Sequence, residues 1–135
     1  MTDSSQEPNW SVQTNAALVA ELKQAGIKHT PEDIVWITKL PDGKIVFLET
    51  GNAKAGLQHI LEDHTVDFAN KGILADQIPD AVLTAVTNGT IVGYQGTGNQ
   101  PRPIYQVNFQ NKTLYIAVTV SKNGFIVGAN PTIIP

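Results

Sequence analysis

The 135-residue sequence contains no cysteine, and none of its apolar runs approaches the roughly 18 residues of a membrane-spanning helix. The absence of cysteine excludes disulfide bonds and thiolate chemistry. The polar N-terminal segment lacks the hydrophobic region of a secretory signal peptide. Charged residues make up only 16% of the chain and the formal net charge is −3, which argues against binding nucleic acid through bulk surface charge. These absences predict a cytoplasmic protein with no membrane segment.

What the chain contains is the composition of one globular domain. Hydrophobic residues make up 41% of the sequence, and a chain of this length buries roughly two-thirds of its unfolded surface. Residues 1–13 are polar and are predicted to form a flexible tail. Residues 14–135 are predicted to form a single α+β domain.

The first half of the predicted domain is a helix and a hairpin followed by two helices. Residues 14–25 have helical apolar spacing and end at Gly26. Two β-rich runs at residues 34–40 and 44–49 flank Pro41-Asp42-Gly43, a hairpin turn sequence. Helices are then predicted over residues 54–70 and from about residue 76 to residue 88.

The second half of the predicted domain is a four-stranded antiparallel sheet. Turn residues separate its four β-rich runs and predict short connections between antiparallel neighbours. The predicted strands are residues 90–95, 103–109, 113–121 and 125–128. A sheet that follows a group of helices is typical of the α+β class.

Two of the three histidines, His59 and His64, fall on the predicted helix over residues 54–70. Their five-residue spacing separates them by about 140° around the axis. His64 falls within the apolar face, so we expect it to be largely buried and His59 to be more exposed. Imidazole suits general acid–base catalysis near neutral pH. The apolar face consists of Leu57, Ile60, Leu61 and Phe68.

Each histidine also has an interpretation without function. A histidine on an apolar face is more often a hydrogen-bonded core residue, and an exposed one is by default a surface residue. Zinc-binding pairs on a helix usually have a four-residue spacing, and no cysteine is present to complete a set. No metal site is therefore predicted.

Hydroxyl groups gather on the predicted strand over residues 113–121. Thr113, Tyr115 and Thr119 alternate with aliphatic residues, so one face of the strand is polar. That face is either a solvent-facing surface of good β-formers or part of a site. Tyr105, on the preceding strand, is either a core residue with a satisfied hydroxyl or a proton donor at a cleft.

Cationic residues are scattered along the chain but could gather in space, where they would contact phosphate. Gly96-Thr97-Gly98 resembles a phosphate-binding loop only superficially, because it connects two strands and not a strand and a helix. Arg102, just beyond this loop, offers a guanidinium for phosphate. The residues that could cluster are Lys54, Lys71, Arg102, Lys112 and Lys122.

Several segments together resemble a family of toxin nucleases. The segments are Gly56-Leu57-Gln58-His59-Ile60-Leu61 with His64 and Phe68, and the closing Asn123-Gly124-Phe125-Ile126-Val127-Gly128-Ala129-Asn130-Pro131. They resemble the C-terminal nuclease domains of bacterial polymorphic and contact-dependent inhibition toxins, and phage-encoded relatives, in the barnase/EndoU/colicin/RelE-like ribonuclease superfamily. The resemblance extends from about residue 44 to residue 132. It implies two helices on a four-stranded antiparallel sheet and RNA cleavage by the substrate's own 2′-hydroxyl, without a metal.

The resemblance also implies the site residues. His59 and His64 match the two histidines of the family's helix, whereas Gly128 and Asn130 stand where related domains often place a Ser or Thr and a Tyr. Because this hydroxyl is missing, Thr119 is the first candidate for the remaining catalytic position. Tyr105 and Thr132 are the next candidates. The predicted catalytic residues are thus His59, His64, Thr119, Tyr105 and Thr132, and the predicted substrate-binding residues are Lys54, Arg102 and Lys122.

The function implied by the resemblance is a metal-independent endoribonuclease toxin domain that needs no cofactor. Its product would be a 2′,3′-cyclic phosphate, and its substrate an RNA such as tRNA. Its expected partner is a cognate immunity protein, and its expected location is the target cell's cytoplasm after delivery. The mild acidity favours an alternative, a non-catalytic acidic immunity or adaptor protein. The missing hydroxyl at Gly128 would fit a third, an inactive phage-derived domain of the same fold.

Overall fold

The structure is a computed structural model that describes residues 12–96 and 101–133. Residues 1–11 of the predicted tail and residues 97–100 of the predicted glycine-containing loop lie outside the described residues. The first helix, α1 (Val12–Gln24), begins two residues before the predicted start. None of the helices in the described ranges is long and apolar enough to cross a membrane.

The four predicted C-terminal strands form one antiparallel sheet in the order β3-β4-β5-β6. They are β3 (Thr90–Gln95), β4 (Arg102–Phe109), β5 (Lys112–Val120) and β6 (Ile126–Pro131). The β4–β5 turn places Gln110 and Asn111 at positive φ, 52° and 65°, which suits a tight hairpin. The prediction of a helix-first α+β fold with a four-stranded antiparallel sheet is confirmed.

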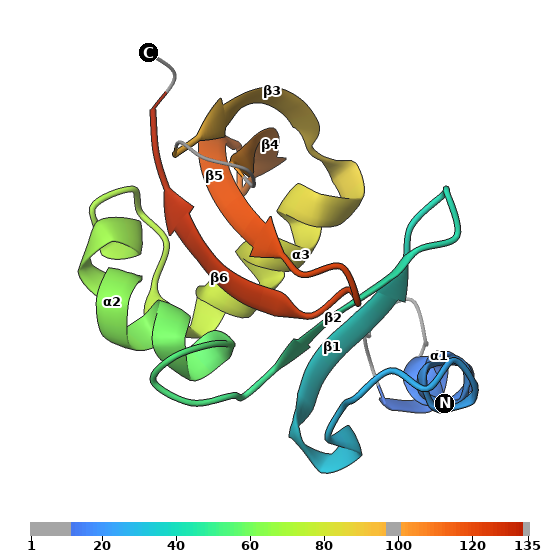
Figure 1. The fold of residues 1–135 in the computed structure, drawn as a ribbon. Helices are drawn as coiled ribbons and strands as arrows, with labels where there is room; N and C mark the ends of the chain where they lie inside the picture. Colours follow the sequence, from blue (N-terminus) through green and yellow to red (C-terminus); the bar gives the residue numbers. More distant parts are fainter. Residues whose placement is uncertain (1–11, 97–100, 134–135) are drawn as a thin grey trace, which may run out of the picture.

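Two helices hold this sheet from different sides (Figure 1). Helix α2 (Leu57–Ala69) lies alongside β6, and the backbone N–H of Gly56 at its start donates to the Val127 carbonyl over 3.0 Å. Helix α3 (Ile78–Asn88) lies behind the sheet and follows the short 3₁₀ turn η3 (Ala75–Gln77). Pro79 is tolerated in the first turn of α3, where no intrahelical N–H is needed.

The N-terminal part of the chain forms a hairpin that is attached to the start of β6. Strands β1 (Ile34–Lys39) and β2 (Ile45–Glu49) pair with each other and follow the 3₁₀ turn η2 (Pro31–Asp33). The Phe47 N–H donates to the Gly124 carbonyl over 2.8 Å, and the rings of Phe47 and Phe125 meet edge to face. Helix α1 covers the other side of the hairpin (Figure 1).

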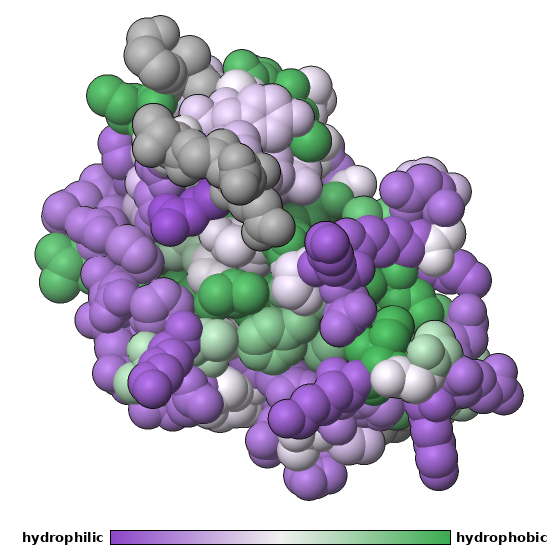
Figure 2. All heavy atoms as spheres, viewed as in Figure 1, coloured by the Kyte–Doolittle hydropathy of each residue, from purple (hydrophilic) through white to green (hydrophobic). Residues whose placement is uncertain are grey.

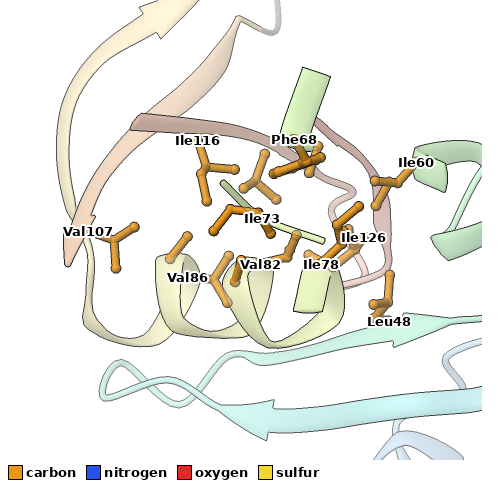
Figure 3. Packing of buried hydrophobic residues seen from close by; sticks show 14 of the residues in the cluster. Leu48, Ile60, Phe68, Ile73, Ile78, Val82, Val86, Val107, Ile116 and Ile126 are labelled. Carbon is orange, nitrogen blue, oxygen red and sulfur yellow. The ribbon is translucent and has the colours of Figure 1, made fainter. Parts of the chain in front are cut away.

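The main core lies between α3, the sheet, α2 and β2 (Figure 3). Trp36 of β1 is fully buried, and its indole N–H donates to the Pro79 carbonyl over 3.0 Å. A smaller cluster joins α1 to the hairpin through Leu22, Ile37 and Phe47. This packing holds α2 against β6, the position on which the candidate site depends.

Candidate functional site

A tight loop over residues 50–56 leads into α2 and shapes the surroundings of the first histidine. Gly51 and Gly56 adopt positive φ, 67° and 93°, and a Cβ on Gly56 would lie 2.9 Å from the Glu49 carbonyl oxygen. Only glycine accepts this combination of φ and close backbone approach. The Asn52 N–H closes the loop on the Ala55 carbonyl over 2.9 Å. The loop therefore holds the Ala53 carbonyl in a defined position over α2.

His59 uses that carbonyl to fix its tautomer. Its Nδ1 lies 3.0 Å from the Ala53 carbonyl oxygen and 3.3 Å from Oδ2 of Asp63. Both partners accept hydrogen bonds, so Nδ1 carries the proton and donates. In the neutral ring the lone pair is therefore on Nε2, which is the arrangement that a general base requires.

The edge of the His59 ring that carries Cδ2 and Nε2 faces Gly128, the one position of β6 that has no side chain. A Cβ built on Gly128 would lie 3.6 Å from Nε2 and 3.4 Å from Cδ2 of His59. Gly128 pairs directly with Thr119 on β5, and directly paired residues share a face with Cβ positions roughly 4.5–5.5 Å apart. The half-buried Thr119 thus lies on the face of the sheet that the His59 ring approaches, and the empty position at Gly128 leaves a gap about the size of one methyl group beside the ring.

The prediction that His64 is buried and His59 more exposed is wrong. The His59 side chain is 26% exposed and the His64 side chain 30%. Loop residue Ala53 covers one side of the His59 ring, and the missing side chain at Gly128 lets the ring approach the sheet. Only Ile60 and Phe68 of α2 are fully buried, because α2 contacts the edge of the sheet and not its face. The apolar contact is therefore narrower than the helical periodicity indicates.

His64 carries a second oriented imidazole on the same helix. Its Nδ1 lies 2.9 Å from Oδ2 of Asp67, which accepts the hydrogen bond and leaves Nε2 for other partners. The start of α2 lies beside Val127 of β6, and its C-terminal end borders the same hollow as Thr132. His64 lies between these two ends, about 140° around the helix axis from His59. Hydrophilic side chains cover the outer surface of this helix (Figure 2).

Gln95, which the sequence analysis did not identify as a candidate, links Arg102 to Thr132 through hydrogen bonds. Arg102 donates to Oε1 of Gln95 over 3.2 Å, and Nε2 of Gln95 donates to Oγ1 of Thr132 over 3.3 Å. In the β4–β5 register Ile104 pairs with Ala117. Extending this register by two residues places Arg102 opposite Thr119. Gln95 acquires this position only when β3 is placed in the sheet, so no local sequence signal identifies it.

Tyr105 lies on the opposite face of the sheet from Gly128, the residue beside His59. It pairs with Ile116 and packs against the core on the α3 side of β4, whereas Thr119 and Gly128 belong to the other face. Burial, with a smaller contribution from Tyr94, raises the pKa of Tyr105 above its ordinary value of 10.0. Tyr105 therefore remains a neutral phenol near neutral pH.

The five cationic residues do not form a single cluster. Lys54 is exposed and follows Ala53, so it lies on the His59 side of the domain. Lys122 is exposed in the turn between β5 and β6. Lys71 and Lys112 come together elsewhere, at the C-terminal end of α2. Within residues 12–96 and 101–133, no group of three or more His, Asp or Glu side chains is arranged to hold a metal ion.

No protein-family model matches the chain, and no curated protein matches it either. The geometry of the site is therefore the main support for a function. It brings together His59, Gly128 and Thr119, places His64 farther along the same helix and leaves Tyr105 on the opposite face of the sheet.

Proposed function

We propose that this protein is a metal-independent endoribonuclease whose general base is Nε2 of His59. The observation that carries the proposal is the hydrogen bond from Nδ1 to the Ala53 carbonyl, which leaves Nε2 as the acceptor beside Gly128. A backbone carbonyl on one ring nitrogen fixes both the tautomer and the orientation of an imidazole. This preorganisation supports a role in proton transfer.

In the proposed reaction, Nε2 of His59 takes the proton of a ribose 2′-hydroxyl. The 2′-oxygen attacks the adjacent phosphorus, and the bond from phosphorus to the 5′-oxygen breaks. His64, in its protonated form, gives a proton to the departing 5′-oxygen. The products are a 2′,3′-cyclic phosphate and a 5′-hydroxyl, with one proton gained by His59 and one lost by His64.

Four further residues, Thr119, Arg102, Lys54 and Lys122, are proposed to contact phosphate groups of the RNA. Thr119 stands across the Gly128 gap from His59 and can donate its hydroxyl proton to a non-bridging oxygen. Arg102, held by Gln95, is level with Thr119 on the neighbouring strand and supplies positive charge. Charges placed where negative charge develops in the transition state lower the barrier. Lys54 and Lys122 would extend the contact to neighbouring phosphates.

The biological setting of the proposal comes from the resemblance to toxin nuclease domains. In that setting the domain would be delivered into the cytoplasm of a target cell and cut RNA there. The producing cell would need an immunity protein that covers the His59 gap. Expression of the isolated chain should then slow the growth of a host that lacks this inhibitor.

The proposal is tested by incubating purified protein with total RNA in the presence and absence of EDTA. We expect cleavage at the same rate in both, with products that end in a 2′,3′-cyclic phosphate. Loss of cleavage in EDTA would contradict the metal-independent mechanism. RNA that stays intact under every condition would contradict the nuclease assignment itself.

A second test uses the side chain that is missing at Gly128. A valine there should cover Nε2 of His59 and lower cleavage by about 10²-fold, because small displacements of a reacting group cost that much. Gly128→Ala is the matched control, since its Cβ would meet the ring at an ordinary 3.4 Å and its φ is not in the left-handed region. Cleavage rates and melting temperatures are measured together. Equal rates for the two variants would show that the gap is not used.

The outer surface of α2 favours a second candidate, a non-catalytic binding protein. Glu62, Asp63 and Asp67 surround Val66, whose exposure of 71% is high for an aliphatic side chain. Such a surface suits a basic protein partner better than RNA. This candidate is favoured if total RNA is not cleaved and expression of the isolated chain does not slow the growth of its host.

A further inference from the structure

Two lysines that are far apart in the sequence lie together at the C-terminal end of α2. Lys71 follows the helix and Lys112 opens β5. Between them, Gly72 adopts φ +85°, and a Cβ on it would collide with the Lys112 ammonium. Both side chains are exposed, and among the described residues neither forms an ion pair with a carboxylate. The Lys112 ammonium thus lies over the residue that follows Lys71, and no ion pair within the described residues neutralises either charge.

A small apolar cavity opens beside Lys71, and Thr113, the neighbour of Lys112 on β5, is among its walls. Its volume is about 180 Å³, and its walls include Phe68, Lys71, Ile73, Leu114, Ile116 and Ile133. A wider hollow next to it shares the walls formed by Lys71 and Thr132 and is bounded by Asp67. Sites for extended ligands usually measure ~300–1,000 Å³, so the cavity has room for one ring system. The combination suits a ligand with one flat apolar part and one anionic group.

We propose that this end of α2 binds one nucleotide of a single-stranded RNA, with its base in the cavity and its phosphate on Lys71 and Lys112. The assignment of the ligand as RNA rests on the proposed function. The span from His59 to Ala69 covers about 15 Å of helix axis at ~1.5 Å per residue. The nucleotide in this second site is therefore a few positions along the strand from the phosphate that is cut.

The hydrogen-bonded chain on the sheet connects the two sites. Thr132 lines the cavity, accepts from Gln95 and through it is joined to Arg102. The strand of RNA would follow the contact between α2 and β6, from the His59 gap to Lys71. A site at this distance contributes binding and register and takes no part in proton transfer.

The lysines also have a purely structural interpretation, because positive charge at the C-terminal end of a helix stabilises the helix. The two interpretations differ in what they predict for ligand binding. A structural role lowers the melting temperature and leaves RNA affinity unchanged. A binding role lowers the affinity and its dependence on salt.

The test compares the double variant Lys71→Gln/Lys112→Gln with Lys23→Gln/Lys28→Gln, a control that changes net charge equally at exposed lysines near α1. The probe is a single-stranded oligonucleotide of 2′-O-methyl ribose, which lacks the attacking hydroxyl and stays intact. For single strands each neutralised phosphate contributes ~0.7 to the slope of log K against log salt concentration, so loss of the one phosphate contact should shrink the slope by about 0.7 in the first variant only. Equal slopes for the two double variants would reject the site.

The base-binding part of the proposal is tested with nucleoside monophosphates and methyl NMR spectra. Binding should move the signals of Ile73 and Leu114 in the wild type, and the lysine double variant should weaken this binding. Unmoved methyl signals would reject the cavity as a base site. A wild type that binds the oligonucleotide through Lys71 and Lys112 but never cuts RNA would reject the proposed ribonuclease and retain this site. If the wild type cuts RNA but the lysines contribute nothing to binding, the ribonuclease proposal is retained and the second site is rejected.

Discussion

His59→Ala should lower the rate of RNA cleavage by about 10²–10⁴-fold, the usual cost of losing a general acid or base. The same change should lower the free energy of unfolding by only about 1 kcal/mol, because it removes one hydrogen bond, to the Ala53 carbonyl, from a partly exposed side chain. The two effects are separated by measuring cleavage of a defined oligoribonucleotide and urea-induced unfolding on the same sample.

The matched control for this change is His29→Ala. His29 also places Nδ1 on a backbone carbonyl, that of Ile27 at 2.7 Å, but it lies in the connection between α1 and η2 and belongs neither to α2 nor to the four-stranded sheet. His29→Ala should therefore cut RNA as fast as the wild type. His59→Ala cutting at the wild-type rate would remove the assigned base. A loss of activity in both variants would point to misfolding and not to catalysis.

Phe68→Ala should lower the free energy of unfolding by about 3–5 kcal/mol. Phe68 is fully buried in the last turns of α2 and joins this helix to the main core (Figure 3). Truncation removes apolar area from the core and leaves a cavity that the surrounding sheet cannot fill. The measurement is the free energy of unfolding from a urea titration that is monitored by far-UV circular dichroism.

Val66→Ala on the same helix is the control for that prediction. Val66 is 71% exposed, so its truncation should change the unfolding free energy by less than about 0.5 kcal/mol. A cost below about 1 kcal/mol for Phe68→Ala would contradict the packing of α2 against β6. The position of His59 over Gly128 would then lose its support as well.

The elements of this fold are predictable because their signals are local. Pro41-Asp42-Gly43 lies within the predicted turn between β1 and β2, and Gly72 follows the end of α2 as expected. Turn residues likewise separate β4 from β5 and β5 from β6. Each of these signals acts on a few neighbouring residues through φ, hydrogen bonding or apolar spacing, so it needs no knowledge of distant contacts.

The surroundings of the candidate site were only partly predictable. The sequence identified His59, His64 and Thr119 as candidates, but it gave the wrong burial for the two histidines. The error has a physical origin, because the groups that cover His59 are the Ala53 carbonyl of a preceding loop and the empty position at Gly128. Helical periodicity reports on one helix and contains no information about either group.

The sequence by itself determined the order and type of the elements and the absence of thiol chemistry, because local periodicity, turn chemistry and composition decide these properties. Only the tertiary structure decided which side chains meet. The β5–β6 register places Thr119 opposite Gly128, and a hydrogen bond joins Gln95 of β3 to Thr132, which follows β6. A shift of one residue in a strand would turn each side chain to the other face, so these contacts depend on long-range pairing that no local pattern encodes.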